Sequence, residues 1–222
     1  MTKKLRGKGA GKSAGKPTIR STYRHGDLRR ALLEAGIALA RIGGPDAVVL
    51  REATRQAGVV PNAAYRHFAS RQDLLEAVRS AALSELAKAM EAELEKGARK
   101  RGANAATASL RAVGVGYLQF ALTETGLFRT AFSTPENLGL GPNPERSGRS
   151  GLNPFELLSA ALDTMAEAGQ LPPERRMGAE FLAWSAVHGF AMRVIDGPLR
   201  TVPRAQIDAL GQRVVEMVEK GL

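Results

Sequence analysis

The sequence predicts an all-α protein with a helix-turn-helix in its first third. Two observations carry the fold class. Apolar residues recur at steps of three and four along most of the 222 residues. No alternating apolar and polar run is long enough to predict a strand. A short motif predicts the helix-turn-helix, and the distribution of charge along the chain indicates the kind of molecule that it binds.

The charge is concentrated in the first third of the chain. The formal net charge is +10, and residues 1–80 carry 16 Lys and Arg against 6 Asp and Glu, whereas the rest carries 16 of each. An excess of this kind favours a polyanion as partner. The alternative is a solubilising tail on an unrelated domain, but the excess continues beyond the tail into the first helices.

Composition excludes several classes of protein. The chain has no cysteine, which rules out disulfides and thiolate chemistry. No apolar run reaches the about 18 residues that a membrane helix needs, and no apolar segment follows the basic N-terminus, as it would in a signal peptide. We therefore expect a cytoplasmic protein without a membrane partner.

Residues 1–22 are expected to form a disordered basic arm. They are rich in Lys, Gly and Ser, contain no acidic residue and have nothing with which to build a core. The arm either lies along DNA phosphates or in a minor groove, or it is a solvated tail.

Residues 23–70 are expected to form the helix-turn-helix domain. Its first helix should begin near Asp27, which is a plausible cap, and run to Ile42 before the Gly43-Gly44-Pro45 break. Residues 50–68 then hold two short helical patterns that meet at a turn containing Gly58, and Pro61 opens the second.

The second short helix has the residue types that a major-groove reader needs. Asn62 can pair with adenine through its amide, and Ala63 offers a methyl contact. Arginines around this helix are suited to phosphate, although each taken singly is also consistent with a solvated surface charge. The predicted DNA-binding residues are Arg24, Arg51, Arg55, Pro61, Asn62, Ala63, Tyr65, Arg66, His67 and Arg71.

Residues 71–222 are expected to form the body. Ser70 is a natural N-cap for a long helix that ends around Gly97. Residues 133–154 are a long loop, either a lid over a pocket or a disordered segment, with disorder slightly favoured. In the last helix, Ile207, Leu210, Val214 and Met217 form the a/d seam expected of helix pairing. Further helices are expected over 102–123, 127–132, 155–169, 173–195 and from 203 onward. The apolar stripes expected to face inward include Ile42 of the first helix, Phe155 and Leu158 of the helix over 155–169, and Phe181 of the helix over 173–195.

Nothing in the sequence indicates an enzyme. The three histidines are far apart and none has a metal-ligand spacing, and there is no Gly-x-Ser-x-Gly motif. Carboxylates such as Glu91 are expected on exposed helix faces. No catalytic residue, metal or cofactor is therefore predicted.

Several motifs together resemble the tetracycline-repressor (TetR) family of bacterial regulators. The similarity is closest over residues 23–80 and looser over the rest. In the second half the sequence is similar to the branch with a WHG-type C-terminal domain. The segments that carry the resemblance are Tyr23-Arg24-His25-Gly26-Asp27-Leu28-Arg29, Ala57-Gly58-Val59, Tyr65-Arg66-His67-Phe68, Arg71, Leu74-Leu75, Phe120-Ala121, Gly126-Leu127-Phe128-Arg129, Trp184 and His188-Gly189.

The resemblance implies a ligand-responsive transcriptional repressor with a three-helix helix-turn-helix DNA-binding head and a larger α-helical body for ligand binding and dimerisation. Such a protein forms a homodimer through its last two helices, binds a pseudo-palindromic double-stranded DNA operator, and is released when a small molecule enters a cavity in the body. The body carries no net charge, and its aromatic residues suggest a small apolar or aromatic effector. Helical aromatics are more often simple core, and His188 in particular is read either as a core histidine or as a pocket residue. The predicted pocket residues are Tyr117, Phe120, Phe128, Phe132, Met165, Trp184 and His188.

The sequence departs from the family pattern at the starts of the two short helices. Val49 and Val60 stand where the family usually has a hydroxyl that caps the helix or binds phosphate, and Asn62 replaces a usual Gly. A lost cap costs about 1 kcal/mol. The basic arm and the arginines are expected to compensate. The main alternative function is an architectural protein that coats DNA with little sequence preference, and an enzyme that uses the body cavity is a remote third.

Overall fold

The computed structural model describes residues 28–98, 105–133 and 143–222, and every regular element in these ranges is helical. The predicted all-α class is confirmed. The expected basic arm, the Asp27 cap and Arg24 lie outside the described residues. The elements in chain order are α1 (Leu28–Gly43), η1 (Pro45–Ala47), α2 (Leu50–Gln56), α3 (Pro61–Ala64), α4 (Arg71–Ala98), α5 (Ala105–Thr123), α6 (Thr125–Ala131), η2 (Pro144–Arg146), α7 (Pro154–Glu167), α8 (Pro173–Arg176), α9 (Ala179–Ile195) and α10 (Arg204–Gly221).

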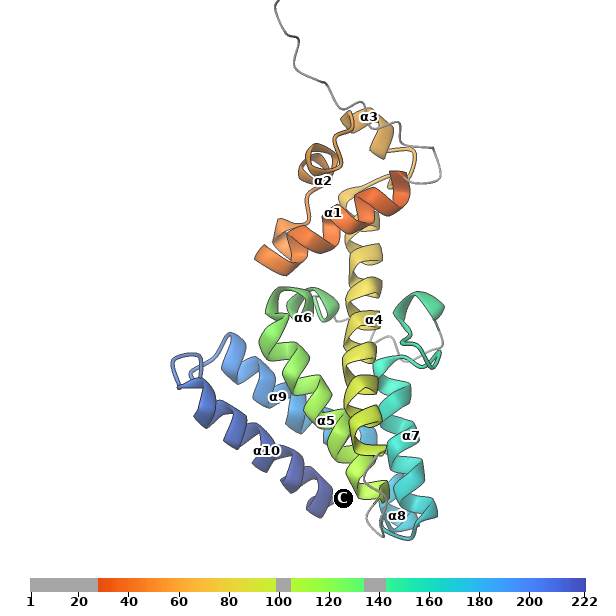
Figure 1. Ribbon diagram of the computed structural model, residues 1–222, viewed down its shortest axis with the longest axis vertical. Coiled ribbons are helices and arrows are strands. Elements are labelled where there is room, and N and C mark those ends of the chain that lie inside the picture. Colours follow the sequence, from red (N-terminus) through yellow and green to blue (C-terminus); the bar gives the residue numbers. More distant parts are fainter. Residues whose placement is uncertain (1–27, 99–104, 134–142) are drawn as a thin grey trace, which may run out of the picture.

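Helix α4 is the axis of the molecule. The helices α1 to α3 gather at one end of it, and α5 to α10 surround its other end (Figure 1). The helix has 28 residues, and the predicted Ser70 cap is present, since the Ser70 hydroxyl accepts a hydrogen bond from the Asp73 N–H at 3.1 Å. Because one uninterrupted helix serves both groups, no linker separates the head from the body.

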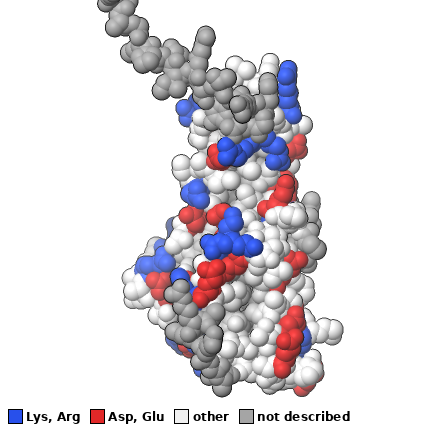
Figure 2. All heavy atoms as spheres, turned by 45° about the vertical axis from the view of Figure 1, so that its right-hand side comes forward, with Lys and Arg blue, Asp and Glu red and all other residues white. Residues whose placement is uncertain are grey.

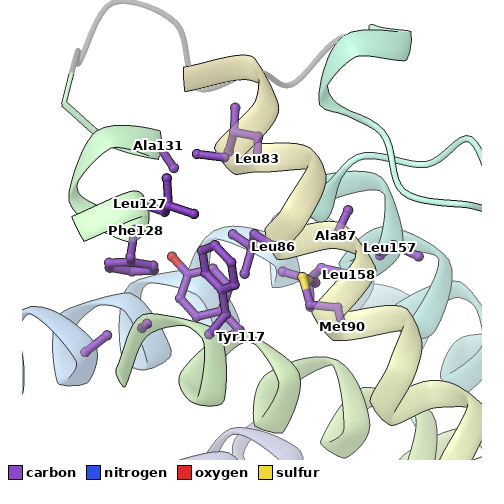
Figure 3. Packing of buried hydrophobic residues seen from close by; sticks show 14 of the residues in the cluster. Leu83, Leu86, Ala87, Met90, Tyr117, Leu127, Phe128, Ala131, Leu157 and Leu158 are labelled. Atoms are coloured by element: carbon purple, nitrogen blue, oxygen red, sulfur yellow. The ribbon is translucent and has the colours of Figure 1, made fainter. Parts of the chain in front are cut away.

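The buried residues form one core that follows α4 from end to end. In the head, the Leu74 and Val78 side chains lie against Gly36 of α1. In the body, Leu86 and Met90 of α4 face Tyr117 of α5, and α6 and α7 complete the packing (Figure 3). Burial of one large apolar side chain stabilises a fold by about 1.5–3 kcal/mol, so a shift of α4 in one part disturbs packing in the other.

The expected helix over 173–195 is in fact two helices, α8 and α9. Gly178 lies between them with φ 79°, a left-handed conformation that ends the four-residue α8. The break also turns Phe181 outward, and 47% of it is exposed although it was expected on the inward face. Ile42 was expected on the inward stripe of the first helix and is 88% exposed, because it lies in the last turn of α1.

The segment from 143 to 153 is ordered, which corrects the slightly favoured prediction of disorder over 133–154 in this part of the loop. It contains η2 and lies against α4. At its end, Asn153 caps α7: its side chain accepts hydrogen bonds from the N–H groups of Phe155 and Glu156, while Glu156 accepts one from the Asn153 N–H. This reciprocal capping box fixes the direction in which the chain enters α7.

Replacing Asn153 with Ala should lower the free energy of unfolding by about 1–2 kcal/mol, because a fully buried cap is lost. Chemical denaturation of the two proteins measures this. Asn153→Asp keeps an oxygen acceptor and serves as the control that should retain most of the stability. Equal stability of N153A and the parent would contradict a structural role for the cap.

Candidate functional site

The head presents a short exposed helix after a tight turn. Helix α2 ends at Gln56 with Ala57 as its C-cap, and Gly58, with φ 68°, reverses the chain into the four-residue α3. The Val59 N–H bonds to the Thr54 carbonyl at 3.0 Å and closes the turn. Ala64 and Phe68 are buried and anchor α3 to the head. The predicted helix-turn-helix is present, with a recognition helix held from its C-terminal end.

The start of α3 faces solvent. Val60 is 69% exposed, Pro61 and Asn62 are exposed, and Tyr65 at the other end of the helix is 56% exposed. Neither Val49 nor Val60 makes a side-chain cap bond, so the departures noted in the sequence leave both helix starts uncapped. Of the other predicted residues, Ala63 and His67 are half-buried.

Lys and Arg side chains are visible on the surface of the head (Figure 2), but the head arginines differ in whether another described residue binds them. Arg51 and Arg66 are exposed, and neither side chain makes a hydrogen bond or ion pair with another described residue. Arg55 instead pairs with Glu52 on the same helix, with Nε 3.0 Å from a carboxylate oxygen. This hydrogen bond lowers the pKa of Glu52 and raises the pKa of Arg55. The two arginines best placed for a polyanion are therefore Arg51 and Arg66.

Arg71, predicted as a phosphate contact, is committed to the backbone of the head. Its Nε donates to the Val48 carbonyl at 2.8 Å and its Nη2 donates to the Pro45 carbonyl at 2.7 Å. Both carbonyls lie just before α2, in and after η1. The planar guanidinium has the fork of donors that this bridging requires. Arg71 thus ties the first turn of α4 to the start of the helix-turn-helix.

The body contains a cavity of about 70 Å³ between α4, α5, α7, α9 and α10. Its walls are apolar and aromatic, and none of the lining residues is charged. The residues that line it are Leu83, Met90, Leu110, Val113, Gly114, Tyr117, Phe132, Asn153, Pro154, Phe155, Leu158, Ala183, Trp184, Val187, Val215 and Val218. An apolar pocket with few polar groups is the usual form of a small-molecule site.

A hydrogen-bond network lies at one wall of the cavity. The Trp184 N–H donates to the Tyr117 hydroxyl at 3.1 Å, and that hydroxyl is 2.7 Å from His188 Nδ1. Because the Tyr117 hydroxyl accepts from Trp184, its own O–H is best placed to donate to Nδ1, so that Nδ1 of His188 is the acceptor and Nε2 carries the ring proton. Burial lowers the pKa of His188 and raises the pKa of Tyr117, although the Trp184 bond partly opposes the latter.

Of the predicted pocket residues, Tyr117, Phe132 and Trp184 line the cavity, whereas Phe120, Phe128, Met165 and His188 do not. Phe128 is fully buried with its ring edge-on to Tyr117 at a centroid distance of 5.4 Å. His188 packs against Phe132 at 4.9 Å and Phe128 at 5.6 Å. Two of the predicted rings that do not reach the cavity, Phe128 and His188, pack instead on the aromatic residues behind its wall.

The sequence reading missed wall residues on α7 and α10. Phe155 and Leu158 were recognised as an inward stripe but not as cavity walls, and Val215 lies one position from the predicted seam. Periodicity predicts which face of a helix is buried and cannot distinguish a packed neighbour from a void. Within the described ranges, no group of His, Cys, Asp or Glu has the arrangement of a metal site, and none of the helices there combines the length and apolar character needed to cross a membrane.

Both parts of the chain match known families. Residues 32–78 match the family described as bacterial regulatory proteins, tetR family. Residues 110–218 match the family described as tetracyclin repressor-like, C-terminal domain. Together the two segments span more than half of the chain. No curated protein matches it.

Solved structures share the fold over almost their whole length. A Rhodococcus protein of unknown function is 26% identical with a TM-score of 0.71, and the match covers 91% of this chain and 99% of that one. The TetR family transcriptional regulator PfmR from Thermus thermophilus is 21% identical with a TM-score of 0.55, and the match covers 86% of this chain and 98% of that one. The second likeness is evidence for the fold alone.

The free energy of unfolding should fall between pH 7.5 and pH 5.5 in a way that depends on His188. Burial holds the pKa of His188 below its ordinary 6.5. The unfolded chain therefore binds a proton before the folded chain does, and stability that is complete above pH 6.5 is lost as the pH falls through the folded-state pKa. Denaturant unfolding at both pH values should show a smaller decrease for His188→Gln than for the parent. Equal decreases would contradict the buried, neutral imidazole.

Proposed function

This chain belongs to the tetracycline-repressor (TetR) family of bacterial regulatory proteins, and on that premise we propose that it is a ligand-responsive transcriptional repressor. A TetR-family regulator is a DNA-binding protein, and proteins of this family are generally not enzymes. The proposal goes further: a homodimer binds a pseudo-palindromic operator, and a small effector in the body cavity releases it. The observation that carries it is the exposed start of α3, close in sequence to Arg51 and Arg66, whose side chains bind no other described residue. Binding to genomic DNA implies a cytoplasmic location.

In this proposal α3 enters the major groove by its N-terminal end, as recognition helices do. Asn62 reads adenine through its amide. Tyr65, Arg51 and Arg66 contact phosphates on either side of the groove. The residues over Pro61–Ala64 are short, so the backbone of α3 can approach the bases closely.

Apolar exposure on the last two helices supports the dimer. On α9, 65% of Leu182 is exposed, and a Cβ added at Gly189 would meet nothing within 4 Å. On α10, 60% of Met217 is exposed, whereas Ile207 of the predicted seam is buried inside the chain. Exposed apolar side chains on adjacent helices favour burial against a second copy. A two-fold axis there would put two heads on half-sites about 34–36 Å apart or a multiple of this spacing.

The lining of the cavity favours a small, uncharged effector. None of the described residues that line the cavity is charged, and Tyr117, His188 and Trp184 make their side-chain hydrogen bonds to one another. A charged ligand would lose its hydration there without a compensating partner. The volume of about 70 Å³ is well below the roughly 300–1,000 Å³ of most ligand pockets, so an effector of ordinary size must push the walls apart.

Selection from random double-stranded DNA should yield a two-fold symmetric site that the full-length protein binds with strong preference over scrambled DNA. Asn62→Ala should then lose about 1–3 kcal/mol of discrimination at one base pair in each half-site, because the bidentate amide is removed. Fluorescence anisotropy with single-base variants measures the loss. Gln56→Ala, on α2, is the control that should keep the preference. Near-equal affinity for all sequences, with a steep salt dependence, would instead indicate an architectural DNA-coating protein.

An uncharged aromatic probe such as prodan should quench Trp184, the only tryptophan, and should weaken binding to the selected operator. Val113→Phe places a ring in the cavity and should prevent the quenching by occupying the volume. Ser185→Ala, on the exposed face of α9, is the matched control. If prodan quenched Trp184 as strongly in V113F as in the parent protein, the probe would bind outside the cavity.

A further inference from the structure

Buried polar side chains are concentrated where residues 143–153, here called the strap, cross helix α4. Among the described residues, nine polar or charged side chains are buried, and six of them belong to the strap or to the α4 face beneath it. These six are Arg79, Ser80, Glu91, Arg146, Ser147 and Asn153. The proposed binding of DNA and effector uses none of the charged groups among them.

At its lower contact the strap closes around a buried carboxylate. Glu91 of α4 is 6% exposed, although the sequence reading expected it on an exposed face. Its carboxylate accepts hydrogen bonds from the N–H groups of Arg149 and Ser150, both at 2.8 Å, and from the Ser150 hydroxyl at 2.6 Å. Burial alone would raise the pKa of Glu91, but these hydrogen bonds outweigh burial and leave its pKa lowered.

Only glycine fits where the strap passes over this carboxylate. A Cβ added at Gly148 would lie 2.5 Å from Glu91 Cδ and 2.6 Å from Oε2. The strap therefore lies in direct contact with the Glu91 side chain of α4, and even one methyl group there must either move the strap or displace the carboxylate from its donors in the strap.

At its upper contact the strap inserts an arginine beside the head. Arg146 is 7% exposed and donates to Glu76 at 2.9 Å and to Ser80 at 3.4 Å. Glu76 also accepts from Arg79 at 2.9 Å. Between the two contacts, the Ser84 hydroxyl donates to the Ser147 carbonyl at 2.7 Å. Beyond Glu91, Arg149 also donates to Glu95 at 3.2 Å. The strap thus binds α4 at five levels, from Glu76 to Glu95.

The two ends of the strap lie at the two proposed sites. Its last residue, Asn153, lines the cavity together with Pro154 and Phe155. Its upper contact, at Glu76, lies little more than one helical turn beyond Arg71, which binds the Pro45 and Val48 carbonyls of the head. Hydrogen bonds therefore connect the strap to α4 as far as Glu76, and the first turns of α4 lead from there to Arg71 and the backbone before α2.

The polar character of this contact suits a switch better than a support. Buried charged pairs cost desolvation energy and are weak stabilisers compared with apolar packing. Hydrogen bonds, however, are directional and are lost over small displacements, so the strap is either seated on α4 or released from it. An effector that enlarges the small cavity pushes directly on Asn153–Phe155.

We propose that the strap is the element that transmits the state of the cavity to the DNA-binding head, by seating on helix α4 when the cavity is empty and separating from it when the cavity expands. The inference rests on the proposed function in that it takes the cavity as the effector site. It assigns the transmission to Arg146, Gly148 and Glu91, as positioning residues that contact neither ligand.

The test displaces the strap without any effector. Gly148→Ala places a methyl group against Glu91 in the full-length protein. Hydrogen–deuterium exchange of amides 45–56 in the head should then be at least about fivefold faster, and affinity for the selected operator should fall about tenfold. Arg146→Met, which removes the upper contact, should act in the same direction, and the double variant should be no worse than the stronger single one.

Two controls separate transmission from general loosening. Gly97→Ala adds a methyl group on the same helix, where it would meet only Ala112 at 3.8 Å. Thr107→Val removes the Thr107 hydroxyl hydrogen bond to Gln170 at 2.6 Å and loosens the body away from the strap. Both should leave exchange in the head unchanged. Ser84→Ala removes one strap bond without a clash and replaces G148A if that variant does not fold, with a smaller effect expected.

The outcomes distinguish the inference from the proposed function. If amides 45–56 of G148A exchange as in the parent, or if T107V accelerates them equally, the strap does not transmit. Additive effects of G148A and R146M would also overturn the inference. If no operator can be selected, the proposed function fails, while exchange in the head still decides whether the strap controls it.

Discussion

Helix α4 packs in both the head and the body, and the rest of the structure depends on this. Its first turns lie under α1, and its later turns lie against α5, α6 and α7. A close-packed interior does not deform continuously. The head and the body are therefore held in one geometry unless a contact along α4 changes as a unit. The Arg71 bridge extends this constraint to η1 and α2, because the guanidinium fixes the backbone just before the first helix of the motif.

Helical periodicity predicted most of the architecture. The steps of three and four identified α1, α4, α5, α6, α7 and α10 with their inward faces, since a stripe of apolar side chains is a local property of the sequence. The break at Gly178 was missed because Pro173 was taken as the start of one long helix, and a single Gly inside such a segment does not by itself require a break. Ile42 shows the complementary limit: it has the right spacing, but at the end of α1 no neighbouring element remains to cover it.

The functional residues were less predictable, for a physical reason that the arginines illustrate. Arg51, Arg55, Arg66 and Arg71 look alike in the sequence, but only their surroundings decide which remains unpaired and which binds carbonyl groups. The same holds for Glu91, whose partners are backbone N–H groups some sixty residues away. Backbone donors have no sequence signature, so a carboxylate that depends on them resembles any surface charge. In the cavity, likewise, the aromatic content was evident, but which rings face the void and which pack on one another depends on helix geometry.

The shared helix also determines where this protein can be cut and rejoined. In a hybrid sensor that joins this body to a foreign head, a junction at the start of α4 separates Arg71 from the carbonyls that it bridges. A junction a few residues later separates Glu76 from Arg146. We therefore expect that a head cannot be exchanged at the boundary between residues 70 and 71 that the sequence suggested. A transferable head includes the first turns of α4, and it needs an acidic side chain at position 76 to receive the arginine of the body.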